Sequence, residues 1–180
     1  MIKNFKLFLS DNSNDLRKPY SNFIIDNGPY SYLITLTFRK RLSEDDCIRH
    51  INFLFFLLNR KIFRSKNGDD FLNGFCFFEK HGQYANNDLH CHIIIKHNEL
   101  LDIESKKPFV EHFWSCLKKV KILTDKNSQL ETDLLPNAFD ESCCKIDTIY
   151  EISNLIKYLT KRFEKESDAS WIKPINGFGI

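Results

Sequence analysis

Short runs of apolar, β-branched and aromatic residues, separated by turn-forming residues, recur along this chain. Runs of this length and composition are typical of β-strands that bury one or both faces. The first is SYLITLTF, and two later ones, GFCFFE and LHCHIIIK, flank the polar connection HGQYANND, which resembles a hairpin loop. We therefore expect strands at 31–38, 74–79 and 89–96, and a fourth over the run CCKIDTI at 143–149.

Three other segments repeat their apolar residues with the spacing of an α-helix. Ser43 is suited to be an N-cap and is followed by three acidic residues, so the first helix is expected from there to about Arg64. Pro108 suits the first turn of a second helix, over PFVEHFWSCLKKV. A third helix is expected at about 150–165, with one apolar stripe made of Ile152, Leu155, Ile156, Leu159 and Phe163.

The order of these elements is β-α-β-β-α-β followed by one more helix. This order predicts an α+β, ferredoxin-like fold, in which helices cover one face of an antiparallel sheet. The length of 180 residues fits a single domain. We expect residues 1–29 to form a loosely organised N-terminal arm and residues 30–180 to form the domain, with a long loop at 124–142 and an irregular tail.

Composition narrows the class of protein only modestly. A net charge of +2 does not indicate a protein that coats nucleic acid, although local basic surface is compatible with it. The six cysteines include no Cys-x-x-Cys pair, which argues against a structural zinc site, and we expect them to be reduced. The longest apolar run, Phe53 to Leu58, is far shorter than the roughly 20 residues that span a bilayer. With no visible secretion signal, we expect a cytoplasmic protein that does not interact with membranes.

The third expected strand contains two histidines, His90 and His92, within an apolar run. Residues i and i+2 of a strand point to the same face, so the two imidazoles should lie side by side, with Cys91 pointing into the core. Glu79 ends the preceding strand, and a hairpin would bring it close. Two imidazoles and a carboxylate suit Mg²⁺ or Mn²⁺ in a phosphoryl-transfer enzyme, although zinc or iron also fits these ligand types. The alternative is a pair of surface histidines on a solvated sheet face.

The last expected helix carries a candidate nucleophile. At about 100° per residue, Tyr158 falls roughly 120° from the centre of the apolar stripe, and Lys161 lies within side-chain reach of it. A tyrosine hydroxyl can attack a phosphodiester and retain the cut end, and a lysine and a metal ion would stabilise the developing charge. Tyr150 is the competing nucleophile, but it has no lysine three residues later. A half-exposed tyrosine without a catalytic role is the alternative.

Together these motifs resemble those of the HUH endonucleases, specifically the replication initiators (Rep proteins) of rolling-circle plasmids, phages and small single-stranded DNA viruses. SYLITLTF resembles their first motif, LHCHIII their histidine–hydrophobic–histidine motif, and YLTK, from Tyr158 to Lys161, their tyrosine-x-x-lysine motif. Glu79 matches the acidic residue that often supplies a third metal ligand. The resemblance spans residues 31–163 and implies an RRM-like HUH domain with a C-terminal catalytic helix.

The resemblance implies a metal-dependent, site-specific single-stranded DNA endonuclease, or nickase, that also rejoins strands. Glu79, His90 and His92 would hold Mg²⁺ or Mn²⁺, Tyr158 would form a covalent 5′-phosphotyrosine at a replication origin, and Lys161 would assist. A helicase could then be supplied by the host. Two alternatives stay open: a single-tyrosine transposase with the same chemistry, and a non-catalytic nucleic-acid-binding module with an RRM-like sheet. The residues that bind DNA are not indicated by the sequence.

Overall fold

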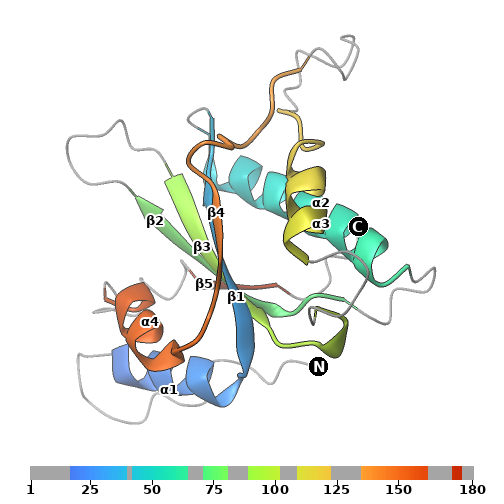
Figure 1. Cartoon of the computed structure of the whole chain (residues 1–180). Coiled ribbons are helices and arrows are strands. Elements are labelled where there is room, and N and C mark those ends of the chain that lie inside the picture. Colours follow the sequence, from blue (N-terminus) through green and yellow to red (C-terminus); the bar gives the residue numbers. More distant parts are fainter. Residues whose placement is uncertain are drawn as a thin grey trace.

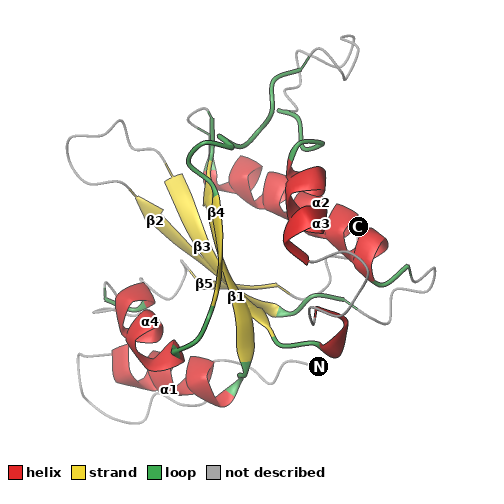
Figure 2. Cartoon of the chain, viewed as in Figure 1, coloured by secondary structure: helices red, strands yellow, loops and turns green. Residues whose placement is uncertain are grey.

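The computed structural model of the chain describes residues 17–39, 42–64, 71–80, 89–101, 109–122, 135–161 and 172–175. Its strands are β1 (Tyr30–Thr37), β2 (Gly74–Lys80), β3 (Leu89–Lys96), β4 (Lys145–Thr148) and β5 (Ile172–Ile175). They form one five-stranded sheet in the order β4-β1-β3-β2-β5, and every neighbouring pair is antiparallel. The central strand β3 is therefore bonded to β1 on one side and to β2 on the other (Figure 2).

Two pairs of helices pack on opposite faces of this sheet (Figure 1). α2 (Glu44–Ile62) and α3 (Phe109–Leu117) cover one face, and a short 3₁₀ helix at Glu99–Leu101 precedes α3. α1 (Arg17–Asp26) and α4 (Ile152–Leu159) lie together against the other face.

Alternation along the strands separates two hydrophobic clusters. In β1, Ile34 and Leu36 are fully buried beneath α2 and α3, in the larger cluster. In the central strand, Ile94 instead joins the smaller cluster with Ile156 of α4 and Ile24 of α1. The sheet thus has apolar residues on both faces, and the smaller cluster holds α1 and α4 in place.

The structure is α+β with an antiparallel sheet, as predicted, and it is compatible with a ferredoxin-like fold. The observed order is α1, β1, α2, β2, β3, α3, β4, α4, β5. Helices lie on both faces of the sheet, so the expectation of helices on one face only was wrong. None of the helices in the described part of the chain is long and apolar enough to cross a membrane.

Two further elements differ from the expectations. Part of the expected arm is helix α1, whose Tyr20 and Ile24, one turn apart, are buried against the sheet. The expected irregular tail contains β5, which pairs with β2 at the edge of the sheet. An edge strand tolerates Pro174 because only one of its sides needs backbone donors. Residues 1–16, and the part of the predicted last helix beyond Lys161, lie outside the described residues.

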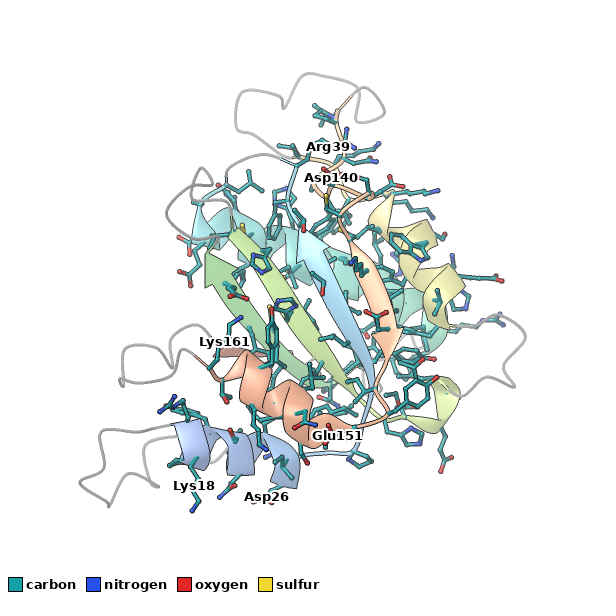
Figure 3. The ribbon with its side chains drawn as sticks, turned by 60° about the vertical axis from the view of Figure 1, so that its left-hand side comes forward. Lys18, Asp26, Arg39, Asp140, Glu151 and Lys161 are labelled. Carbon is teal, nitrogen blue, oxygen red and sulfur yellow. The ribbon has the colours of Figure 1, made fainter. Side chains whose placement is uncertain are left out.

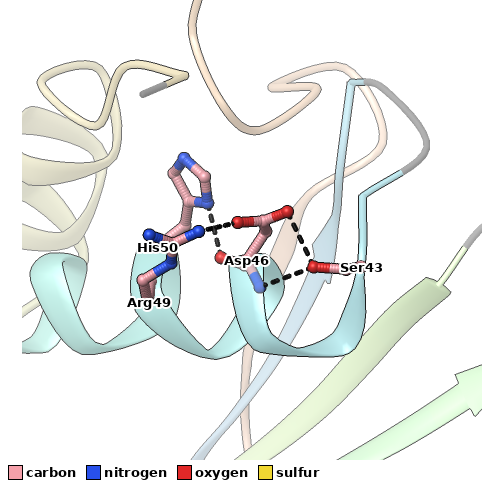
Figure 4. A network of polar contacts seen from close by, with 4 residues as sticks. All are labelled: Ser43, Asp46, Arg49 and His50. Atoms are coloured by element: carbon pink, nitrogen blue, oxygen red, sulfur yellow. Dashed lines mark hydrogen bonds and ion pairs between the residues drawn. The ribbon is translucent and has the colours of Figure 1, made fainter. Parts of the chain in front are cut away.

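The long helix α2 begins at the predicted cap (Figure 4). The Ser43 hydroxyl accepts a hydrogen bond from the Asp46 backbone N–H at 3.1 Å and donates to Asp46 Oδ2 at 2.7 Å. Arg49 forms an ion pair with the same carboxylate. These hydrogen bonds, with Ser43 first and Arg49 second, hold the pKa of Asp46 below its ordinary value. The cap therefore stabilises the ionised form of Asp46 in the folded protein.

Replacing Ser43 with alanine should lower the free energy of unfolding by about 1 kcal/mol at pH 7, because an N–H of the first turn loses its acceptor. A lowered pKa contributes stability above the unfolded pKa, and that contribution is lost as the pH falls through the folded pKa. The difference between the Ser43→Ala variant and the original protein should therefore shrink as the pH falls below about 4, because Asp46 is protonated, but it should not vanish, because the hydrogen bond to the Asp46 backbone N–H does not depend on pH. Urea unfolding at a series of pH values measures this.

The matched control is Asp45→Asn, which removes a charge from the same helical turn without touching the cap. It should cost only about 0.3 kcal/mol through the helix dipole. Equal stabilities of the original protein and Ser43→Ala at pH 7 would contradict the assignment of the cap.

Candidate metal centre

The pairing of β2 with β3 places Glu79 directly opposite His90. His92 lies two residues further along β3, so its side chain points to the same face of the sheet. Cys91, between the two histidines, points the other way and is fully buried in the larger cluster. The sheet geometry thus gathers three side chains that the sequence places 11 to 13 residues apart, from 79 to 90 and 92.

The donor atoms of these three side chains converge. Glu79 Oε2 lies 3.3 Å from His90 Nε2 and 3.5 Å from His92 Nε2. Each of the three side chains offers one donor atom, and these three atoms all lie within 4.8 Å of one another. The side chains are only 9% (His90), 12% (His92) and 15% (Glu79) exposed, so competition from bulk water is limited.

This cluster can hold a metal ion. Two imidazole nitrogens and a carboxylate oxygen form a mixed nitrogen and oxygen donor set, which suits first-row divalent ions such as Mn²⁺ and leaves positions open for other ligands. The donor set alone does not select one metal, so the identity of the ion, Mg²⁺ or Mn²⁺ in the sequence-based prediction, remains a prediction.

The C-terminal end of α4 meets Glu79 and His92. Figure 3 labels Glu151 and Lys161 at opposite ends of this helix, with Lys161 at the end towards the strands. Lys161 Nζ lies 3.1 Å from Glu79 Oε1 and 3.8 Å from the centroid of the Tyr158 ring. The Tyr158 ring in turn meets the His92 ring edge to face, with centroids 5.7 Å apart. The structure therefore brings Tyr158 and Lys161 together with Glu79, His90 and His92.

Local interactions fix α4 in this position. The Glu151 side chain caps the helix by accepting hydrogen bonds from the backbone N–H groups of Asn154 and Ser153, and these bonds, with Asn154 first, lower the pKa of Glu151. At the other end, the Thr160 hydroxyl donates to the carbonyl of Ile156 and lies 3.0 Å from the Ser21 hydroxyl of α1. The helix is thus tied to the sheet by its apolar stripe and to α1 by this hydroxyl contact.

The two candidate nucleophiles have different surroundings. Tyr158 is 46% exposed, in keeping with a position beside the apolar stripe, and it contacts both His92 and Lys161. Tyr150 was expected to start the helix, but α4 begins at Ile152, because Glu151 is its cap. The Tyr150 side chain is 94% exposed. Tyr158 is therefore the tyrosine that lies against the candidate metal centre.

Sequence reasoning missed Thr35 of β1. Thr35 lies opposite His92 in the sheet, and its hydroxyl oxygen is 3.1 Å from His92 Nδ1. In SYLITLTF the threonines alternate with Ile34 and Leu36, which could have placed them on the face away from the larger core. The register that sets Thr35 against His92 depends on pairing between distant segments, and the sequence alone did not supply it.

The cysteines are not part of this centre. All six are free, and Cys47, Cys76, Cys91, Cys116 and Cys144 are buried. Burial raises the pKa of Cys47 to about 12 and that of Cys144 to about 11, and it also raises the pKa of Cys91. Buried thiols with raised pKa values are poor nucleophiles and poor metal ligands. They act here as small apolar residues of the core.

Comparisons with known proteins add no relative: no family model, no curated protein and no solved structure matches this chain.

The described geometry predicts that the protein binds Mn²⁺ through these three residues. Titration calorimetry should show one site, and His90→Ala should abolish or strongly weaken binding because a nitrogen ligand is lost. His97→Ala is the control, since His97 is exposed and lies 2.9 Å from the Ser31 hydroxyl, outside the ligand group. Unchanged Mn²⁺ binding in His90→Ala would show that the ion binds elsewhere.

Proposed function

We propose that this protein is a metal-dependent endonuclease that nicks single-stranded DNA and can rejoin it through a covalent tyrosine intermediate. One observation carries the proposal: Tyr158 and Lys161 lie against the group formed by Glu79, His90 and His92. A nucleophile, a cation and a metal-binding group on one face of a sheet are the parts that such a reaction needs. The resemblance of the same motifs to those of rolling-circle replication initiators supports this proposal.

Each side chain has a defined part in the proposed reaction. A divalent ion held by Glu79, His90 and His92 would polarise the scissile phosphate. The hydroxyl oxygen of Tyr158 attacks the phosphorus, so a bond forms between that oxygen and phosphorus while the bond from phosphorus to the 3′ oxygen breaks. The tyrosine proton passes to solvent, and the departing 3′ oxygen takes up a proton to become a free hydroxyl. The 5′ side of the cut stays attached as a phosphotyrosine.

Lys161 supports this chemistry in two ways. Its ammonium group lies over the Tyr158 ring, where its positive charge would stabilise the negative charge that develops on a phosphate under attack by Tyr158. Its contact with Glu79 Oε1 also fixes one carboxylate oxygen, while Oε2 faces both histidines. Rejoining is the reverse reaction, in which a 3′ hydroxyl attacks the phosphotyrosine.

The surroundings of the histidines favour this function over a non-catalytic nucleic-acid-binding module. In such a module the exposed sheet face would only need to contact bases, whereas here the histidine nitrogens face a carboxylate and are largely shielded from water. For the biological setting, we propose initiation of rolling-circle replication at an origin; the order of the motifs, with the tyrosine after the histidines, fits a single-tyrosine transposase equally well.

The test is covalent attachment of DNA to the protein. Incubation with circular single-stranded DNA and Mn²⁺ should give a nicked product and a protein–DNA adduct on a denaturing gel. Tyr158→Phe should reduce adduct formation by roughly 10³-fold or more, because the attacking oxygen is removed. Tyr150→Phe is the matched control and should form the adduct at the original rate.

The opposite pattern, with loss of the adduct in Tyr150→Phe only, would overturn the assignment of the nucleophile. DNA cleavage without any adduct in the original protein would indicate hydrolysis by water and would overturn the proposed covalent mechanism.

A further inference from the structure

We infer that Thr35 is a positioning residue, which holds His92 in the tautomer and orientation that present its Nε2 to a metal ion. The inference rests on the proposed metal centre and adds to it a residue from a third strand. Thr35 does not itself contact the predicted ion, and its effect passes through the imidazole of His92.

The sheet register supplies the geometry. Thr35 of β1 and His92 of β3 are directly opposite each other, and Thr35 Oγ1 lies 3.1 Å from His92 Nδ1. The other ring nitrogen, Nε2, lies 3.5 Å from Glu79 Oε2 on the far side of the ring. The imidazole is therefore held between a hydroxyl on one edge and the carboxylate ligand on the other.

The chemistry of imidazole explains why the Thr35 hydroxyl matters for metal binding by His92. A neutral histidine has one N–H and one lone pair, and a metal ion binds to the lone pair. When an ion is bound at Nε2, the ring proton must be on Nδ1, where it can donate to Thr35 Oγ1. A hydroxyl can accept this bond, whereas a methyl group in the same place cannot. Partners of this kind, one step removed from the metal, orient histidine ligands and raise their basicity.

Thr35 is well suited to a positioning role because its own side chain is constrained. β1 is bonded to β3 on one side and to β4 on the other, with Thr35 opposite Lys145 of β4 as well as His92. A β-branched residue in a strand has few side-chain rotamers, so the hydroxyl stays close to one position. His92 thus has a fixed partner, and little rotational freedom is lost when a metal ion binds.

The same strand provides a matched control. Thr37 lies opposite His90 on the same face, but its hydroxyl donates to the carbonyl of Cys143 at 3.4 Å. The two threonines thus share residue type, strand and face, and differ in which group the hydroxyl contacts.

The test compares Thr35→Val, Thr35→Ser and Thr37→Val by calorimetric titration with Mn²⁺. Thr35→Val should weaken Mn²⁺ binding by roughly 10- to 100-fold, the usual effect of losing such a partner. Thr35→Ser should restore most of the affinity, and Thr37→Val should bind as the original protein does.

Equal Mn²⁺ affinity in Thr35→Val and the original protein would overturn the inference and leave the metal centre standing. An equal loss in Thr37→Val would also overturn it, because the effect would then come from the strand and not from the hydroxyl. If the original protein binds no Mn²⁺, the proposed metal centre fails and the inference fails with it. Unchanged unfolding midpoints in urea confirm that each variant is folded.

Discussion

The candidate site depends on the register of β3 against its two neighbours. Pairing with β2 places Glu79 opposite His90, and pairing with β1 places Thr35 opposite His92. Because side chains alternate between faces, a slip of one residue would send both histidines into the larger core and expose Cys91. The same slip would turn Lys96 towards that core, so the alternation of polar and apolar positions along β3 fixes the register that the site requires.

The two faces of the sheet differ in what they hold. The face under α2 and α3 holds most of the buried residues, including Ile34, Leu36 and Cys91. The other face is shared between the smaller cluster, which seats α4, and the polar group at the ends of β2 and β3. The larger hydrophobic cluster and the candidate metal centre thus lie on opposite faces of the same strands. Cys91 packs directly behind the two histidines.

The sequence was informative where the signal was local. Spacing within LHCHIIIK predicted the common direction of His90 and His92, and the cap at Ser43 predicted the start of α2. It was least informative where a segment is defined by packing at long range. Helix α1 is short and buries few residues, and β5 contains a proline, so neither has a strong local pattern. Thr35 was missed for the same reason, since its partner lies 57 residues away in the chain.

The candidate site combines side chains from a central strand with side chains from a short helix, and these two elements differ in how easily they open. Both histidines belong to the central strand, which is hydrogen-bonded on both sides and cannot open without breaking the sheet. Tyr158 and Lys161 belong to, or directly follow, a helix of eight residues, too short to persist without its packing against the sheet and α1. Local opening of the α1–α4 pair would therefore withdraw the tyrosine and the lysine while the three candidate metal ligands stayed in place. The proposed reaction, in which a strand end is first held and later released, would gain from such an arrangement, because one half of the site can move while the other half stays rigid.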